Sequence, residues 1–151
     1  MDLNIREKIV QHIQSELGSK IEELRSAIEV ARESRDNETK SSVGDKYETG
    51  RAMVQMELEK TQAQLAKTES LLTTLQKIDL QNPSTKIGFG SFVVSDSGNY
   101  FFSIAFGELK INNISVFCLS PLSPIGKVLA GKTAGEKVDF QNRSIQIKDV
   151  F

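Results

Sequence analysis

The chain has 151 residues, with 19 basic and 20 acidic side chains and a formal net charge of −1. Such a balance argues against a protein that grips duplex nucleic acid through bulk positive charge. The single cysteine, Cys118, excludes an internal disulfide and suits a reducing cytosol. The start of the chain lacks the apolar core of a signal peptide, and no stretch is apolar and long enough to span a bilayer. We therefore expect a soluble cytoplasmic protein with no membrane partner.

The first segment has the pattern of a long amphipathic helix over residues 4–34. Its apolar residues recur at spacings of three and four, which places them on one face of a helix. They are Ile9, Ile13, Leu17, Ile21, Leu24, Ile28 and Ala31. Residues 34–42 then contain no apolar side chain, and Gly44 permits a sharp reversal of the chain.

A second helix is predicted over residues 45–78, with an apolar seam that repeats as heptads. The seam consists of Arg51, Val54, Leu58, Thr61, Leu65, Thr68, Leu72 and Leu75. The two threonines in mid-seam suit an intramolecular hairpin better than a long autonomous coiled coil. We therefore expect residues 1–80 to form an antiparallel helical hairpin with arms about 45 Å long.

Two carboxylates follow the predicted bend. Asp45 and Glu48 are three residues apart, so on a helix they share a face. Magnesium is commonly held by one or two carboxylates together with phosphate oxygens. An acid at this position also stabilises a helix N-terminus as a cap or first-turn residue. The two residues alone leave both interpretations open.

The pattern changes after residues 81–84, where Pro and Asn break the helix. Short β-branched and aromatic runs predict strands, and a turn at residues 97–99 predicts a hairpin between the first two. We expect residues 81–151 to form a small antiparallel β domain with one short helix, giving an α+β protein. The expected strands cover 89–93, 100–106, 111–119, 137–140 and 144–147, and the helix covers 125–129.

Residues 126–133 match the phosphate-loop pattern G-x-x-x-x-G-K-[ST]. That loop presents free backbone N–H groups and is followed by a helix. Here Val128 and Leu129 fill the supposed loop with bulky apolar side chains, and a turn follows Thr133. We expect a structural helix and turn, and no nucleotide-binding residues.

Three stretches resemble the C-terminal signature of the bacterial GreA/GreB transcript-cleavage factors. They are residues 114–116, the run from Ser123 to Lys132, and residues 135–138. The resemblance implies a helical hairpin followed by an FKBP-like domain that docks at the rim of the secondary channel of RNA polymerase. The residues it assigns to docking are Ser123, Pro124, Ile125, Gly126, Lys127 and Lys132.

The resemblance extends to the hairpin tip near residues 44–48. The family's tip reads Gly-Asp-x-x-Glu-Asn-Ala-Glu-Tyr, and Gly44, Asp45 and Glu48 match its opening. This implies that Asp45 and Glu48 are catalytic residues holding a Mg²⁺ ion shared with the polymerase. Arg51 stands where the family has a third acid, so its charge would weaken a cation site or contact phosphate. We assign Arg51 and Lys46 to contact with RNA phosphates.

The expected function is that of an accessory elongation factor, which completes the polymerase's active site and is not itself an enzyme. It would act as a monomer and stimulate cleavage of backtracked nascent RNA, without contacting duplex DNA. One alternative is a secondary-channel regulator like DksA, which does not cleave. Another is a general protein-interaction module. Prolyl isomerase activity, known for FKBP-like domains, is disfavoured because the domain is short and lacks Trp.

Overall fold

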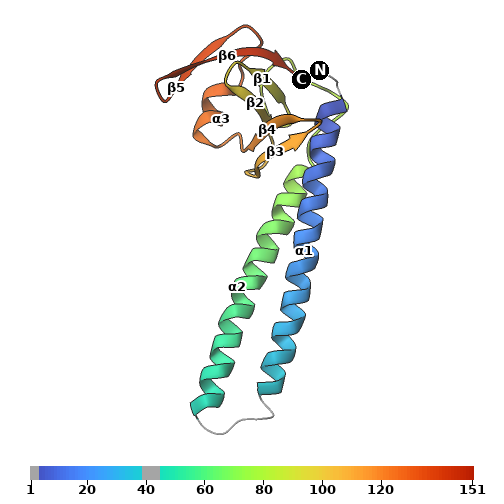
Figure 1. Cartoon of the computed structure of the whole chain (residues 1–151), viewed down its shortest axis with the longest axis vertical. Helices are drawn as coiled ribbons and strands as arrows, with labels where there is room; N and C mark the ends of the chain where they lie inside the picture. The colour runs from blue at the N-terminus through green and yellow to red at the C-terminus, as the bar shows by residue number, and fades with distance from the viewer. Residues whose placement is uncertain (1–3, 39–44) are drawn as a thin grey trace. The chain divides into compact units, whose positions relative to one another are not determined.

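The chain folds into two long helices followed by a six-stranded mixed sheet with one short helix (Figure 1). The structure is a computed structural model that describes residues 4–38 and 45–151. It divides into two compact units: a helical unit, Ser15–Leu72, and a sheet unit that combines Met1–Gln14 with Thr73–Phe151. The predicted α+β class is confirmed. Within the described residues, no helix has the length and apolar character needed to cross a membrane.

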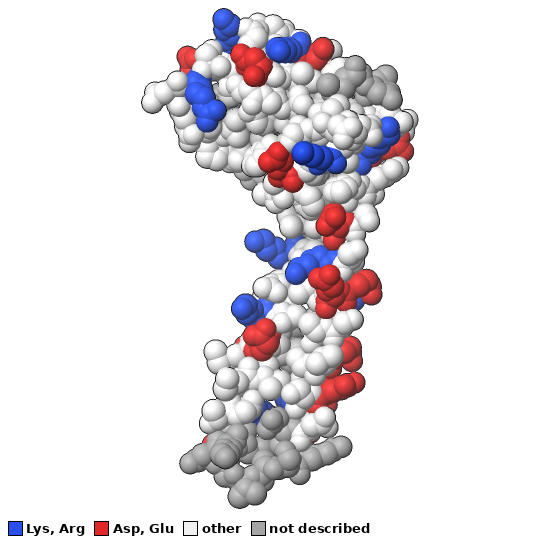
Figure 2. Space-filling view, viewed as in Figure 1, with Lys and Arg blue, Asp and Glu red and all other residues white. Residues whose placement is uncertain are grey.

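The helical unit pairs α1 (Asn4–Glu38) with α2 (Asp45–Leu75) in opposite directions. Arg25 Nη2 lies 3.6 Å from Glu69 Oε1, and Arg35 Nη1 donates to Gln55 Oε1 at 3.4 Å. From Arg25 to Arg35 along α1, the contacting residue on α2 moves back from Glu69 to Gln55, so the two helices are antiparallel, as predicted. Figure 2 shows acidic and basic side chains interspersed along the outer surface of this pair.

The interface between the two helices is the predicted apolar stripe. Ile21, Leu24 and Ile28 of α1 are buried, together with Leu58 of α2. Two threonines are also buried in α2, and each satisfies its hydroxyl within the helix. Thr61 Oγ1 donates to Glu57 O at 2.9 Å, and Thr68 Oγ1 donates to Gln64 O at 2.8 Å. A hydroxyl bonded to the carbonyl one turn earlier can occupy an apolar seam without leaving an unsatisfied donor.

The sheet has the strand order β3-β4-β2-β1-β6-β5. It is mixed, because β2 and β4 run parallel while the other neighbours run antiparallel. The expectation of a purely antiparallel domain was therefore wrong. The chain reverses once between β2 and β3 and again between β3 and β4, so β4 runs in the direction of β2. The strands are β1 (Phe92–Ser95), β2 (Gly98–Phe102), β3 (Gly107–Ile111), β4 (Ile114–Leu119), β5 (Lys137–Phe140) and β6 (Arg143–Val150).

Three strand predictions need correction: the strand predicted over 89–93 lies at 92–95, the one over 100–106 ends at 102, and the one over 111–119 begins at 114. The strand β3, at 107–111, was not predicted. Asn112 and Asn113 have φ of 51° and 64° and form the two-residue turn between β3 and β4. Asparagine tolerates this left-handed region, which a tight hairpin turn requires. Gln141 and Asn142, with φ of 49° and 63°, make the same kind of turn between β5 and β6. The hairpin predicted between the first two strands is confirmed.

Helix α3 (Pro124–Leu129) covers part of one face of the sheet, and its predicted position is confirmed. The core on this face contains Ile87, Val93, Phe102, Leu119, Leu129, Val138, Ile145 and Ile147. Side chains that alternate with these along the strands form the other face, where Phe92, Phe101, Val116 and Cys118 are all buried. Both faces of the central strands are therefore covered.

A buried arginine connects three distant segments of the sheet unit. Arg6, only 5% exposed, donates from Nε to Gly90 O at 2.8 Å and from Nη2 to Asp79 O at 2.7 Å. Gly90 has φ of +90°, and a Cβ there would lie 3.0 Å from Ile78 Cγ2 and 3.4 Å from Arg6 Nη2. Burial lowers the pKa of Arg6, while the charge of Asp79 opposes that shift. The contact therefore depends on a glycine and on an ionised guanidinium.

We expect Arg6→Met to lower the free energy of unfolding by about 3 kcal/mol, because two carbonyls lose a buried charged donor. The matched control is Arg25→Met. Arg25 is exposed and pairs with Glu22 and Glu69 at the surface, so its loss should cost less than about 1 kcal/mol. Urea unfolding followed by circular dichroism measures both. Equal losses of unfolding free energy in the two variants would show that the buried hydrogen bonds of Arg6 stabilise the protein no more than the surface ion pairs of Arg25.

Candidate functional sites

The first candidate site lies at the start of α2, while residues 39–44, which include Gly44 of the expected tip, lie outside the described residues. Glu48 and Arg51 are exposed and line one shallow depression together with Ala52 and Gln55. The structure therefore brings a carboxylate and a guanidinium to the same surface. Asp45 and Lys46 lie in the first turn of α2, and their side chains fall outside the described residues.

This arrangement has mixed electrostatics. A carboxylate oxygen is the kind of hard ligand that Mg²⁺ prefers, and exposure leaves Glu48 accessible to a partner's metal site. The positive charge of Arg51 opposes a cation in the same depression but attracts phosphate. Such a surface can chemically contribute a ligand to a metal ion or contact a phosphate group.

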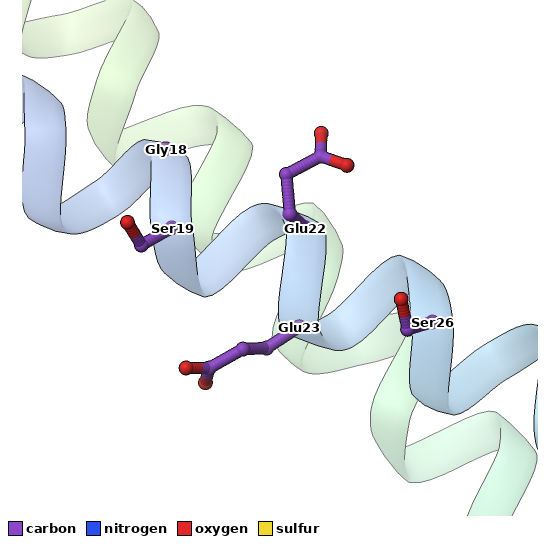
Figure 3. Close-up of a pocket in the computed structure, with 5 residues that line it drawn as sticks. All are labelled: Gly18, Ser19, Glu22, Glu23 and Ser26. Atoms are coloured by element: carbon purple, nitrogen blue, oxygen red, sulfur yellow. The ribbon is translucent and has the colours of Figure 1, made fainter.

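Another pair of acids, Glu22 and Glu23, lines a shallow depression beside Gly18 on α1. Figure 3 shows that these two carboxylates point in different directions. Glu22 also accepts a hydrogen bond from Arg25 Nη1 at 3.1 Å. These acids therefore do not converge on a common ligand position. Within residues 4–38 and 45–151, no group of three or more His, Cys, Asp or Glu side chains is arranged to hold a metal ion.

The second candidate site is the start of α3, which carries the residues assigned to docking except Lys132; Lys132 lies in the turn after the helix, and Gly126 is buried. Ser123 caps the helix: its Oγ accepts from Gly126 N at 3.1 Å and donates to Ser120 O at 2.7 Å. Pro124 takes the first helical turn, where its missing N–H costs nothing. Lys127 is exposed on the helix. Capping thus fixes the backbone that presents Lys127 at the surface.

The phosphate-loop match at residues 126–133 forms the end of α3 and a turn, as predicted. After the helix, Gly131 N donates to Ile87 O at 2.7 Å, and Ile87 N donates to Lys132 O at 2.8 Å. Thr133 donates to Glu136 Oε2 from its backbone N at 2.7 Å and from Oγ1 at 3.1 Å. These hydrogen bonds lower the pKa of Glu136, the backbone bond most strongly. The turn is therefore closed by its own side chains and by the sheet.

Sequence reasoning missed a cavity of about 90 Å³ between α3 and the β5–β6 hairpin. Tyr100, Phe140 and Arg143 contribute to its lining. These residues lie on three separate strands, so periodicity along any one segment does not associate them. The single cysteine is not a second candidate, because burial raises the pKa of Cys118 to about 12 and keeps the thiol protonated.

No protein-family model matches this chain, and no curated protein matches it significantly. Function is therefore inferred from the chain's own residues, from the resemblance of its motifs, and from the positions that the fold gives them.

We expect Gly126→Ala to destabilise the sheet unit by about 1–3 kcal/mol, a typical cost of overpacking. A Cβ at Gly126 would lie 2.5 Å from Ser120 O and 2.9 Å from Pro121 O, both backbone atoms that cannot rotate away. Gly18→Ala is the matched control. Nothing lies within 4 Å of its Cβ position inside α1, so the alanine should stabilise the helix by about 1 kcal/mol.

Thermal unfolding measures the two glycine variants, which should shift the melting temperature in opposite directions. An unchanged melting temperature for Gly126→Ala would show that the loop before α3 adapts freely, and that the close approach at Gly126 does not fix the docking surface.

Proposed function

We propose that this protein binds RNA polymerase at its secondary channel and stimulates magnesium-dependent cleavage of backtracked transcripts. The resemblance of residues 114–116, 123–132 and 135–138 to the GreA/GreB signature supports this proposal, as does the Gly-Asp-x-x-Glu match at residues 44–48. In this proposal the sheet unit is the FKBP-like docking domain, and the helix pair is a coiled-coil hairpin that enters the channel. The protein would be an accessory factor that acts on the polymerase's own active site.

The observation that carries the proposal is the position of Glu48. It is exposed on α2, three residues after the first residue of the helix, just where the chain has reversed direction. Helix α2 has 31 residues and is therefore about 45 Å long. A helix pair of this length can deliver a carboxylate into a channel that a globular domain cannot enter.

In this proposal, carboxylates of the protein supply ligands for a second metal ion in the active site of the polymerase. Two-metal hydrolysis of a phosphodiester uses ions about 3.5–4 Å apart, which stabilise the attacking and leaving oxygens. The polymerase would hold one Mg²⁺ with its own acids, and Asp45 and Glu48 would help to hold the other. Because neither site would be complete alone, the isolated protein should show no nuclease activity.

Docking is assigned to the start of α3. Lys127 is exposed there, and Pro124 is exposed beside it. Ser123 holds the turn through two hydrogen bonds, so the surface is formed before binding. Preorganisation of this kind reduces the entropy lost when a partner binds.

A second candidate function is a secondary-channel regulator that does not cleave, as in DksA. The observation that favours it is Arg51, which lines the same depression as Glu48. A guanidinium beside the acid would weaken binding of Mg²⁺ and favour contact with RNA phosphates. The same binding site on the polymerase would then produce regulation without hydrolysis.

Cleavage of a stalled, backtracked elongation complex distinguishes the two functions. Wild-type protein should accelerate Mg²⁺-dependent shortening of the transcript. Asp45→Asn and Glu48→Gln should each reduce this stimulation at least about tenfold, because each removes a metal ligand. Both variants should bind polymerase as wild type does, because neither residue lies at the start of α3. Arg51→Glu should raise the stimulation or lower the Mg²⁺ concentration that it requires.

Glu57→Gln provides the matched control, since Glu57 is an exposed acid on α2 more than two turns beyond Glu48. This variant should stimulate transcript cleavage by the polymerase as wild type does. Binding without stimulated cleavage at any Mg²⁺ concentration would favour the non-cleaving regulator. Absence of polymerase binding would contradict both functions and leave a general interaction module.

A further inference from the structure

The cavity beside α3 has the features of a binding site for a single side chain. Its volume is about 90 Å³. One water occupies roughly 30 Å³ in the liquid, so this space corresponds to about three waters. Sites for cofactors and drug-sized ligands usually measure about 300–1,000 Å³. The lining residues are Ser97, Tyr100, Ile125, Phe140, Gln141, Arg143 and Ile145.

The fold creates this cavity through strand register. Tyr100 lies beside Phe117 in the parallel β2–β4 pair, two residues before the Phe102 that α3 helps to bury. Tyr100 therefore lies on the same face of the sheet but at its margin, where it is only half-buried. Ile125 enters from α3, and Phe140 enters from β5, opposite Arg143 across the hairpin turn. Aliphatic and aromatic side chains make up part of the walls, and Ser97, Gln141 and Arg143 add polar groups.

One basic side chain, Arg143, lies at the edge of the cavity. Arg143 is exposed and lines the opening. The nearby acid, Asp96, is already engaged, because its Oδ1 accepts from Gln146 N at 2.9 Å and from Ser97 Oγ at 3.3 Å. Burial of the phenol raises the pKa of Tyr100; the charge of Arg143 lowers it and outweighs the opposite effect of Asp96.

A second cavity of about 270 Å³ adjoins the first, since Ser97 and Tyr100 line both. Its far side includes Phe117, an aromatic residue that is 47% exposed, and Glu108. The Glu108 carboxylate accepts a hydrogen bond from Ser115 Oγ. Together the two cavities make one elongated surface of mixed polar and apolar lining with one deeper position, which suits an extended chain better than a compact ligand.

We propose that these adjoining cavities bind an extended segment of a partner protein, in which an aliphatic side chain fills the cavity between Tyr100 and Phe140 and an adjacent carboxylate pairs with Arg143. The volume selects the aliphatic side chain, and the charge at the opening selects the acid. Except for Ile125, these residues differ from those assigned to polymerase docking. Binding of a free peptide can be measured without RNA polymerase, so this proposal can fail or succeed independently of the polymerase proposal.

The probe is the hexapeptide acetyl-Ala-Gly-Leu-Asp-Gly-Ala-amide, added to the full-length protein labelled for NMR. Its binding should shift the methyl signals of Ile125 and Ile145 and the ring signals of Tyr100. Replacing Leu by Gly in the peptide should abolish these shifts. Replacing Asp by Lys should weaken binding about tenfold, the usual value of one charge-assisted hydrogen bond.

Arg143→Glu tests the charge directly and reverses the sign at an exposed position. It should make the Lys peptide bind better than the Asp peptide. Lys148→Glu is the matched control, because Lys148 is exposed on the same strand and does not line either cavity. This control should keep the preference for Asp.

Three results would overturn the proposal: no shift of Ile125, Ile145 or Tyr100 at the peptide's solubility limit, equal shifts with the Gly peptide, or an unchanged Asp-to-Lys ratio in Arg143→Glu. Full reversal of the ratio in Arg143→Glu, with none in Lys148→Glu, would establish the assigned ligand class.

Discussion

The buried guanidinium of Arg6 is the contact on which the sheet unit depends. Its two hydrogen bonds reach across 84 and 73 residues of sequence, to Gly90 O and Asp79 O. A buried charge is costly unless it is fully hydrogen-bonded, so these carbonyls and the first turns of α1 constrain one another. Gly90 is required at the point of closest approach. The first turns of α1 therefore belong with the sheet, although they precede it by some 80 residues of chain.

Residues of α1 belong to both units, and each unit carries its own candidate site. The helical unit holds Glu48 and Arg51, a carboxylate and a guanidinium near the start of α2. The sheet unit holds the capped start of α3 and the cavity beside Tyr100, both of which are suited to binding protein. The residues of one candidate site can therefore be substituted without changing the residues of the other.

Sequence patterns predicted the features that local spacing determines. The stripe through Ile21 and Ile28 and the short helix over 125–129 are examples, because helical spacing and helix-breaking residues are local features of the sequence. Features set by long-range contacts were missed. A charged residue such as Arg6 in a first turn normally predicts a solvated side chain, and the parallel β2–β4 pairing follows from two chain reversals, not from the composition of either strand. The Tyr100 cavity was missed for the same reason, since strand register assembles it.

The central claim is that residues 45–48 approach the catalytic metal of RNA polymerase, and localised radical cleavage tests it most directly. Fe²⁺ replaces Mg²⁺ in the polymerase active site and generates hydroxyl radicals that cut nearby polypeptide. The account predicts that C-terminally labelled protein, bound to the polymerase, is cut near residues 45–51, and that excess Mg²⁺ prevents the cut. Cleavage confined to residues 92–150, or no cleavage of protein that is demonstrably bound, would contradict it.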